Sequence, residues 1–376
     1  MKVTLFLFSL MISLMACHQP IIKNEFIIEG NVKNIPDGKI YLSEAHYWNI
    51  LLDSTECING HFVFKRKIDS SFYPYMAKIM YRNNDSPWRF NTLFFKNEFN
   101  KPGQQQKFID GFYLEPGITI IQGIDTGKTF KGAGSPVMVK AGKQNEILCS
   151  NYLANFGWIR SGDSAARKAR IINYSKQIKD QPNAYFFLES LFNYRSEYSK
   201  DEIKNFLSFF DKEVQESALG NKIRTYLQTR IDPGVAYPDL LLVNPMGQRE
   251  KIMDTTAKLN MLMFWASWCH PCRMEIPVLK KIKNEYKGKG LHLVNISIDD
   301  DRNNWELAMK QENMHWPQYI IDADKPEKIS AIFNFNAIPL VVFIDKNRKE
   351  ITRFAGYEEG GKEKYITVIS KYLTDK

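Results

Sequence analysis

The chain of 376 residues changes its pattern of hydrophobic and polar positions from one third to the next, and each pattern predicts a different structure. In residues 24–133, short alternating runs are separated by turn residues such as Asn59-Gly60 and Pro116-Gly117. Alternation with a period of two is typical of strands buried on one face, and Asn-Gly is a strong hairpin signal. Residues 24–133 are therefore predicted to form an all-β sandwich, with two strands joined at Asn59-Gly60.

A helical pattern follows over residues 136–230, where apolar side chains recur three and four positions apart among charged ones. This spacing gathers the apolar side chains on one face of a helix. Ser199, with Glu202 three positions later, predicts a capping box at the start of one helix, and Gly220 predicts the end of another. We therefore expect a helical linker domain over this segment.

The pattern changes again over residues 235–376, where nearly continuous apolar runs such as "LNMLMFW" and "LHLVNIS" alternate with helical spacing. Such runs are typical of strands that are buried on both faces of a sheet. One helix is expected over residues 271–286. An α/β layered sheet is the prediction for this segment. The predicted fold class is therefore multidomain, with an N-terminal all-β sandwich, a helical middle segment and a C-terminal α/β domain.

The first residues have the composition of an export signal. A positive start at Lys2 precedes a mostly apolar run over residues 3–15, which is shorter than the roughly 20 residues that span a bilayer. The run ends in Leu-Met-Ala-Cys17, which resembles the lipobox of bacterial lipoproteins. The resemblance implies that residues 1–16 are a lipoprotein signal peptide. It also implies that lipid on Cys17 anchors the chain to the cell envelope, on the inner or outer membrane, facing the periplasm. An ordinary signal peptide is the alternative.

Composition narrows the choice of partners. The formal net charge is +9, but the Lys and Arg residues are spread along the chain and form no long basic block. We therefore expect no nucleic-acid partner.

Five cysteines are too few for a fold that is held together by disulfides. Cys57 and Cys149 are isolated, and both are expected to be buried and inert.

Cys269 and Cys272 stand two residues apart behind a tryptophan, where the first buried strand of the C-terminal segment meets its helix. The N-terminus of a helix presents unpaired N–H groups and a partial positive charge, which stabilise a thiolate. Cys269 is therefore the expected nucleophile, which forms a mixed disulfide with a partner. Cys272 is the expected resolving thiol.

Two other interpretations of this pair are weaker. A zinc site requires four ligands, whereas His270, His292 and His315 are isolated in the sequence. A purely structural disulfide would close only the loop of residues 269–272 and would constrain the unfolded chain little. We expect no bound metal ion and no cofactor.

The C-terminal segment, about residues 235–376, resembles the TlpA/ResA-like branch of the thioredoxin and AhpC/TSA superfamily. The matching motifs are Pro238-Asp239, "MFWASWCHPCRMEIP" and "FNFNAIPLVVFIDKNRKEI". The resemblance implies a thioredoxin fold and thiol–disulfide oxidoreductase activity.

The same resemblance implies roles for residues around the two cysteines. The peptide bond between Ile338 and Pro339 is expected to be cis and to lie against the cysteine pair, where the backbone before the proline pairs with a substrate chain. Glu275 is expected to accept the proton of Cys272, because Met263 occupies the position at which thioredoxins carry a buried Asp. A solvated helix carboxylate is the alternative for Glu275.

Two neighbours of Cys269 are expected to adjust its chemistry, and we count both among the residues that meet a substrate. Trp268 is expected to shield the thiols by packing. His270, as an imidazolium, would favour the thiolate and make the disulfide more oxidising. The alternative for His270 is an exposed spacer with little effect.

The N-terminal segment resembles a small domain of unknown function that often precedes thioredoxin-like modules in bacterial lipoproteins. The matching features are loose, and they are "IIEGNV", "DGKIYL", "LLDSTECINGHFVF" and "FYLEPGITII". This second resemblance implies no chemistry.

The function predicted from these features is that of a membrane-anchored periplasmic thiol–disulfide oxidoreductase that acts as a reductant. Its expected partners are thiols and disulfides of exported proteins, and an upstream electron donor in the membrane. A thiol peroxidase of the AhpC/TSA type is one alternative, although such peroxidases carry a lone cysteine in a Pro-x-x-x-Thr/Ser-x-x-Cys motif, whereas Cys269 lies in Trp-Cys-x-x-Cys with Trp265 four residues before it. The other alternative is a non-catalytic binding lipoprotein whose thioredoxin-like domain is passive.

Overall fold

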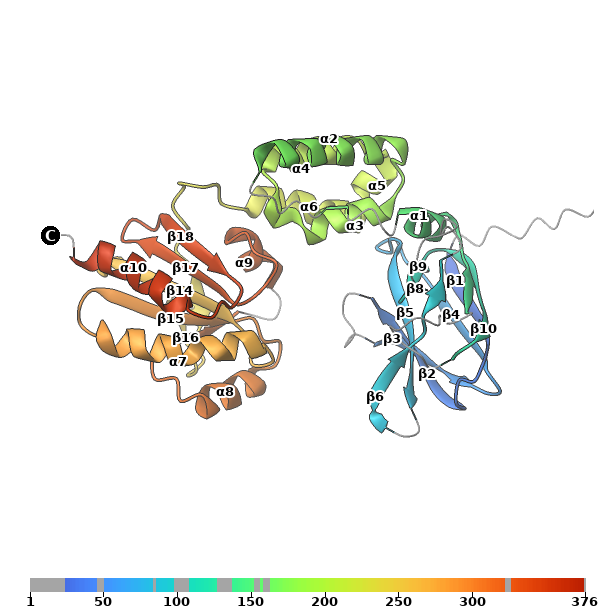
Figure 1. Ribbon diagram of the computed structural model, residues 1–376, viewed down its shortest axis with the longest axis horizontal. Coiled ribbons are helices and arrows are strands. Elements are labelled where there is room, and N and C mark those ends of the chain that lie inside the picture. The colour runs from blue at the N-terminus through green and yellow to red at the C-terminus, as the bar shows by residue number, and fades with distance from the viewer. Residues whose placement is uncertain are drawn as a thin grey trace, which may run out of the picture. The chain divides into compact units, whose positions relative to one another are not determined.

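The computed structural model describes most of the chain, in the ranges 24–45, 51–83, 86–97, 108–126, 137–151, 156–157, 163–321 and 326–374. The predictions for residues 1–16 and for Cys17 lie outside the described residues. The chain divides into two compact units, Met1–Asn155 with Ala184–Phe186, and Phe156–Asn183 with Phe187–Lys376. Each unit is described by itself below, with the elements labelled in Figure 1.

The first unit contains two main β-sheets. One has the strand order β11-β10-β1-β4, and the other has the order β3-β2-β5-β6 with β9 paired to β5. A short pair, β7 with β8, lies in the same unit, as does helix α1 (Lys143–Asn151). The strands are β1 (Glu25–Lys33), β2 (Gly38–Glu44), β3 (Leu51–Cys57), β4 (His61–Lys67), β5 (Tyr75–Asn83), β6 (Ser86–Thr92), β7 (Phe95–Lys96), β8 (Phe108–Ile109), β9 (Phe112–Leu114), β10 (Gly117–Ile124) and β11 (Met138–Lys140).

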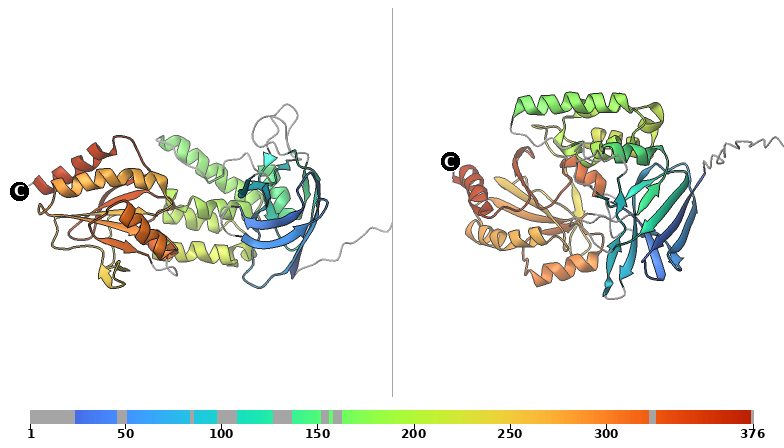
Figure 2. Two further views of the ribbon diagram at one scale, coloured as in Figure 1. Left: turned by 90° about the horizontal axis from the view of Figure 1, so that it is seen from below. Right: turned by 45° about the vertical axis from the view of Figure 1, so that its right-hand side comes forward.

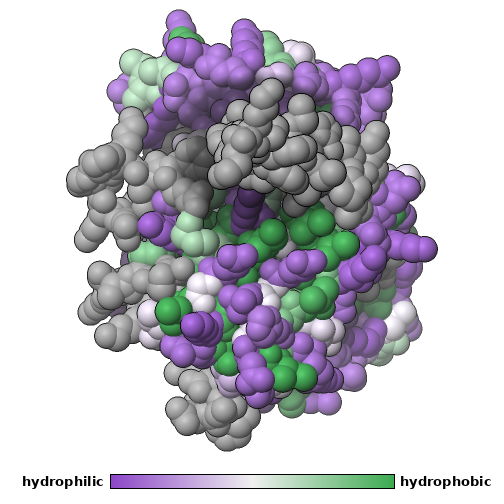
Figure 3. Space-filling model, turned by 90° about the vertical axis from the view of Figure 1, so that its right-hand side faces the viewer, coloured by the Kyte–Doolittle hydropathy of each residue, from purple (hydrophilic) through white to green (hydrophobic). Residues whose placement is uncertain are grey.

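Both main sheets contribute side chains to a single apolar core, so the first unit is a β-sandwich, as predicted. Ile28 and Phe64 come from the first sheet, Ile40 and Ile79 from the second, and all four are fully or almost fully buried. Alternate residues of β4 point outward, and Val63 is 53% exposed. Figure 3 shows the side of the molecule that lies at the right of Figure 1, where hydrophobic residues are interspersed with hydrophilic ones. Single exposed apolar side chains of this kind are normal and indicate no site.

The turn at Asn59-Gly60 is confirmed, but the strand pairing predicted around it is wrong. Asn59 and Gly60 have φ values of 51° and 79°, and Ile58 pairs with His61 across the turn. Beyond this pair, β3 joins the sheet of β2, whereas β4 joins the sheet of β1. The turn therefore connects the two layers of the sandwich, because each strand finds its longer partner in a different sheet.

Helices occupy the middle of the chain. The first begins at Lys143 and not near residue 136, since Met138–Lys140 form strand β11 of the sandwich. The capping box of Ser199 and Glu202 is present at the start of α4. Gly220 does not end a helix, because it lies in the first turn of α6. A Cβ at Gly220 would lie 2.1 Å from the carbonyl oxygen of Gln215, so the close approach of two helix ends explains the glycine. The helices are α1 (Lys143–Asn151), α2 (Ser164–Asp180), α3 (Tyr185–Asn193), α4 (Lys200–Leu207), α5 (Lys212–Glu216) and α6 (Ala218–Thr229), with a 3₁₀ turn at Arg195–Glu197.

The C-terminal part of the second unit is a seven-stranded mixed sheet with helices on both faces (Figures 1 and 2). The strand order is β13-β12-β16-β15-β14-β17-β18, in which β14, β15 and β16 are parallel and β17 is antiparallel to β14. Its strands are β12 (Leu241–Val243), β13 (Arg249–Lys251), β14 (Leu259–Trp265), β15 (Leu291–Ser297), β16 (Gln318–Ile320), β17 (Leu340–Asp345) and β18 (Glu350–Ala355).

Two apolar clusters cover the two faces of this sheet. Side chains of α7 (His270–Glu285), α8 (Arg302–Gln311) and α10 (Gly361–Thr374) pack on the face that carries Met263 and Trp265. Side chains of α9 (Pro326–Ile332) pack on the face that carries Phe264. All seven residues of β14 are buried, as its continuous apolar run predicts. This arrangement confirms the predicted C-terminal α/β fold and places β14 at its centre.

The exact limits of the four predicted segments stay predictions. Within the described part of the chain, no helix is both long enough and apolar enough to cross a membrane.

Candidate redox site

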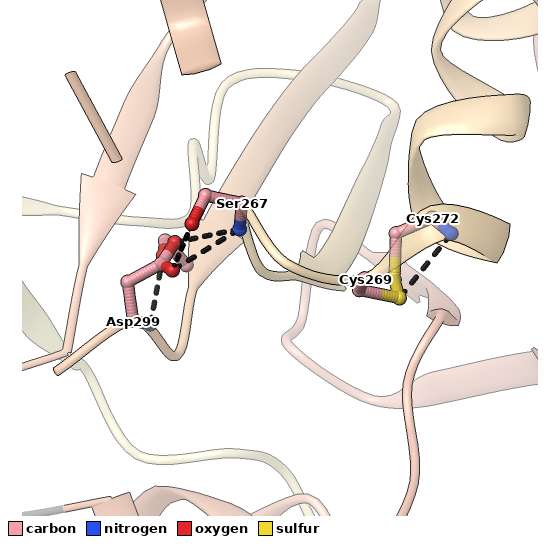
Figure 4. Close-up of a disulfide and its surroundings, with 5 residues drawn as sticks. Ser267, Cys269, Cys272 and Asp299 are labelled. Atoms are coloured by element: carbon pink, nitrogen blue, oxygen red, sulfur yellow. Dashed lines mark hydrogen bonds between the residues drawn. A yellow bond between two sulfur atoms is a disulfide. The ribbon is translucent and has the colours of Figure 1, made fainter. Parts of the chain in front are cut away.

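The two cysteines lie where β14 passes into α7. Cys269 is the N-cap residue of α7, and Cys272 lies in its first turn. The pair forms a disulfide with a Cα–Cα distance of 5.3 Å, and the Cys269 sulfur accepts a hydrogen bond of 3.2 Å from the backbone N–H of Cys272 (Figure 4). Pro271 occupies the first turn, where its missing N–H costs no helical hydrogen bond. The predicted junction is therefore confirmed.

The two sulfur-bearing residues differ in access to solvent. Cys269 is 5% exposed, whereas Cys272 is fully buried. A helix N-terminus stabilises a thiolate through its free N–H groups and its partial positive charge. The geometry therefore suits an outer Cys269 that meets a partner first and an inner Cys272 that reacts second.

The loop before Cys269 is held to the neighbouring strand. The carboxylate of Asp299, just after β15, accepts hydrogen bonds from the backbone N–H of Ser267 at 2.9 Å and from its hydroxyl at 2.6 Å (Figure 4). The backbone N–H of Cys269 in turn donates to the carbonyl of Ala266 at 3.1 Å. The nucleophile therefore follows a tightly connected turn.

Glu275 is a buried carboxyl group, so the alternative of a solvated helix carboxylate is wrong. It is 1% exposed, three residues after Cys272 on α7, and residues three apart on a helix are neighbours on its surface. Burial raises the pKa of Glu275, and a hydrogen bond with Tyr365 of α10 partly offsets this rise in pKa. One carboxyl oxygen, Oε1, has no hydrogen-bond partner. A carboxyl group with a raised pKa holds a proton more readily than an exposed one does.

The Ile338–Pro339 peptide bond is cis, as predicted. Leu340, the first residue of β17, pairs with Phe264 near the end of β14. Pro339 therefore lies at the end of the sheet where the cysteine loop begins. Ile338 packs against the apolar cluster that contains both cysteines. The structure therefore brings the proline loop and the cysteine pair to the same end of the sheet.

Trp268 and His270 flank Cys269 on the surface. Trp268 is 68% exposed, so the prediction that it shields the thiols by packing is wrong in this structure. His270 is also exposed. Both side chains are therefore available to a partner. Trp265 is fully buried, and Met263 is buried beneath α7.

Sequence reasoning missed two residues of this site. Asp299 is the first of three consecutive aspartates after β15, and its position directly after a buried strand was the available signal. Tyr365 lies in α10, ninety residues from Glu275, and no local pattern connects the two. Among the described residues, no group of three His, Cys, Asp or Glu side chains is arranged to hold a metal ion.

Comparison with known proteins finds matches to two parts of the chain. A family model described as thioredoxin-like matches residues 257–350, and a model described as a domain of unknown function (DUF4369) matches residues 26–148. The thiol-disulfide oxidoreductase ResA of Bacillus cereus is 27% identical over 123 residues, which cover 33% of this chain and 69% of ResA. The C-terminal domain belongs to the thioredoxin-like thiol-disulfide oxidoreductases. Within them it is TlpA/ResA-like, as the motifs predicted, and the N-terminal resemblance is confirmed as well.

Further relatives match the same domain. ResA of Geobacillus kaustophilus is 25% identical over 134 residues, which cover 35% of this chain and 75% of that protein. Among solved structures, the thioredoxin domain of a thiol-disulfide oxidoreductase from Bacteroides vulgatus has 22% identity and a TM-score of 0.34, covering 38% of this chain and 99% of that one. StoA from Bacillus subtilis has 19% identity and a TM-score of 0.31, covering 36% of this chain and 99% of that one.

Proposed function

We propose that this protein is exported, held at the cell envelope by lipid on Cys17, and reduces disulfides of other exported proteins on the periplasmic side. The observation that carries the chemistry is the Cys269–Cys272 pair at the N-terminus of α7, with the buried carboxyl group of Glu275 on the same helix. The export signal and the lipobox-like end of residues 1–17 support the location.

The first step of the proposed reaction belongs to Cys269. In the reduced enzyme, its thiolate attacks one sulfur of a partner disulfide and forms a mixed disulfide, while the other partner sulfur leaves as a thiolate and takes up a proton. The N–H of Cys272 already points at the Cys269 sulfur at 3.2 Å and would stabilise the attacking thiolate.

The second step belongs to Cys272 and Glu275. The Cys272 thiol loses its proton and attacks the Cys269 sulfur, which breaks the mixed disulfide and releases the partner with both of its sulfurs reduced. Glu275 is the proposed proton acceptor, because it is buried on the same helix, has one oxygen without a partner and has a raised pKa. Two electrons have then moved from the enzyme to the partner, and the enzyme carries the disulfide that the structure contains.

The partner is proposed to meet the surface around Cys269. Trp268 offers an exposed aromatic side chain, and His270 offers an exposed imidazole beside it. The backbone at Ile338, before cis Pro339, would pair with an extended segment of the partner just before β17 begins, at the end of the sheet where the cysteines lie. A reductant needs a fresh supply of electrons after each turnover, so a dithiol donor in the membrane is proposed upstream.

The reduction potential of the Cys269–Cys272 pair tests this proposal. The full chain would be equilibrated with glutathione or dithiothreitol, and the oxidised and reduced forms of the peptide that contains both cysteines would be counted by mass spectrometry. We expect a value near that of thioredoxin, about −270 mV. A value near −120 mV would make the protein an oxidant and reverse the proposed direction. Absence of a reversible couple would leave a passive binding lipoprotein as the better description.

The proposed anchor is tested separately. Replacing Cys17 with Ala removes the lipid attachment site, so the protein should move from the membrane fraction to the fraction that is released with the periplasm. Retention of the Cys17→Ala chain in membranes would contradict lipid anchoring.

A further inference from the structure

The loop between β14 and α7 is connected to the next strand through one buried carboxylate. The strands β14 and β15 are parallel, and Trp265 pairs with Ser297, so the two strands finish at the same end of the sheet. The backbone N–H of Ile298 donates to the carbonyl of Trp265 at 2.9 Å. Asp299 follows directly, which places its side chain beside the loop that leads to Cys269 (Figure 4).

Asp299 gathers three hydrogen-bond donors from the two chain segments. The backbone N–H of Ser267 lies 2.9 Å from Oδ2, and the hydroxyl of Ser267 lies 2.6 Å from Oδ1. The hydroxyl of Ser297 donates to Oδ2 at 2.6 Å and accepts the backbone N–H of Asp299 at 2.9 Å. We name this set of three residues, Ser267, Ser297 and Asp299, the aspartate clamp.

Burial makes these contacts strong. Asp299 is 4% exposed and Ser297 is fully buried, so water competes little for the carboxylate. The donors are neutral N–H and O–H groups, and hydrogen bonds to a charged acceptor are roughly twice as strong as those between neutral groups. A carboxylate accepts at both oxygens and donates at neither, so Asp suits a site that presents three donors.

We propose that Asp299 is a positioning residue of the redox centre, which acts through Ser267 to hold the Cys269 sulfur at the N-terminus of α7. Ser267 is two residues before Cys269, and the N–H of Cys269 bonds to Ala266 in the same turn. Movement of this turn would therefore carry the sulfur away from the N–H of Cys272. This inference rests on the proposed role of Cys269 as nucleophile.

The clamp has two physical effects that variants can separate. It holds the turn in place, which favours the Cys269 thiolate, and it contributes a negative charge, which disfavours a thiolate nearby. Ser267→Ala removes one donor and keeps the charge. Asp299→Asn removes the charge and replaces one acceptor oxygen with an amide donor that faces other donors. A positioning role predicts slower reaction in both variants, whereas a role through charge alone predicts faster reaction in Asp299→Asn.

Asp300→Asn is the matched control. It makes the same change of charge one residue further along the chain, at an exposed side chain outside the clamp. The next two charged residues have contacts of their own. Asp301 caps α8 by accepting the N–H of Asn303, and Arg302 forms an ion pair with Glu306. Ser267→Thr is the conservative variant, since it keeps the hydroxyl donor.

The test uses the reduced full chain in mild detergent. The rate of reaction of Cys269 with oxidised glutathione would be measured, with the pH dependence of its alkylation followed by mass spectrometry. We expect Asp299→Asn to slow the reaction about tenfold and Ser267→Ala about threefold, with a higher apparent thiol pKa of Cys269 in Ser267→Ala. Ser267→Thr should restore most of the rate, and Asp300→Asn should match the unchanged protein.

Three results would overturn the positioning role. One is an Asp299→Asn rate equal to or above that of Asp300→Asn. Another is an Asp299→Asn chain that melts at a lower temperature but reacts at an unchanged rate per folded molecule, which would make the clamp merely structural. If Asp299→Asn does not fold, an unchanged rate and thiol pKa in Ser267→Ala has the same meaning. A Cys269 that is unreactive in the unchanged chain would instead contradict the proposed function, and the positioning role would fall with it.

Discussion

The β-sandwich and the thioredoxin-like domain each bury a cysteine beside the end of a strand. The two cysteines differ in the surroundings of their sulfur atoms. Cys57 is 1% exposed at the end of β3, and Cys269 is 5% exposed beyond the end of β14. Burial raises the pKa of Cys57, against only a backbone hydrogen bond from Gly60 that lowers it. Cys269 instead caps a sixteen-residue helix and accepts the N–H of Cys272.

The difference teaches that burial does not decide what a cysteine does. A helix N-terminus adds a partial positive charge to the N–H that points at the sulfur, whereas the single backbone donor of Cys57, from Gly60, is outweighed by burial. Cys57 accordingly packs as a small apolar residue in the sandwich core. Four experiments would break or sharpen this comparison.

The largest expected effect comes from removing each sulfur in turn. Cys269→Ser should lower the rate of disulfide exchange with a model partner by on the order of a thousandfold or more, because the attacking thiolate is lost. Cys57→Ser should leave the rate unchanged, because this sulfur is buried in the core of the sandwich. The rate of reduction of a fluorescent disulfide peptide measures both. A comparable loss in Cys57→Ser would end the contrast between the two domains.

The reactivity of the two thiols toward an alkylating agent should differ by at least about a hundredfold at pH 7. After reduction, the helix N-terminus would favour the thiolate of Cys269, whereas the raised pKa of Cys57 favours its thiol. Brief treatment of the native chain with iodoacetamide, followed by peptide mass spectrometry, gives the ratio directly. Equal labelling of Cys57 and Cys269 would mean that the helix N-terminus does not activate the sulfur.

Glu275→Gln should slow release of the partner from the mixed disulfide by about tenfold to a hundredfold, with little effect on the first attack by Cys269. The amide cannot accept the Cys272 proton, whereas attack by Cys269 does not involve Glu275. Rapid-mixing experiments with a disulfide partner separate the two steps. Glu285→Gln, at the exposed end of the same helix, is the matched control. Slowing of both steps equally would argue against a proton-transfer role.

The smallest expected effect concerns the stability of the oxidised form. Burial raises the folded-state pKa of Glu275 above its unfolded value of about 4.3, so the folded state holds this proton more tightly. Its contribution to stability is therefore present at low pH and is lost as pH rises from the unfolded pKa through the folded one. Glu275→Gln never ionises, so it should melt above the unchanged protein at pH 8.

The two melting temperatures should converge near pH 4, where both side chains are neutral. A calorimetric scan of the oxidised chains at pH 4, 6 and 8 measures the difference. A Glu275→Gln protein that is less stable at pH 8 would show that the ionised carboxylate is well solvated in the folded state.

The local part of the redox site could be predicted because its determinants are close together in the chain. A buried strand, a two-residue spacer and a proline at the first turn place Cys269 at a helix N-terminus whatever surrounds them. The cis bond at Pro339 was predicted too, from a family motif rather than from local physics.

Other features depend on contacts that no local pattern contains. Asp299 reaches Ser267 across 32 residues because β14 and β15 are parallel and in register. The strands that flank Asn59-Gly60 separate into two sheets because their longer partners, β1 and β2, lie in different layers. The strand β16 was not predicted, since its three residues are too few to show a period.

By itself the sequence determined the order of the domains, the buried strands of the C-terminal sheet and the position of the redox pair, because periodicity and helix-terminal hydrogen bonding act within a few residues. Only the tertiary structure decided that Glu275 is buried, that Trp268 is exposed and that Asp299 holds the cysteine loop. Burial and long-range hydrogen bonds are properties of what packs against a residue, and that is settled only when distant segments meet.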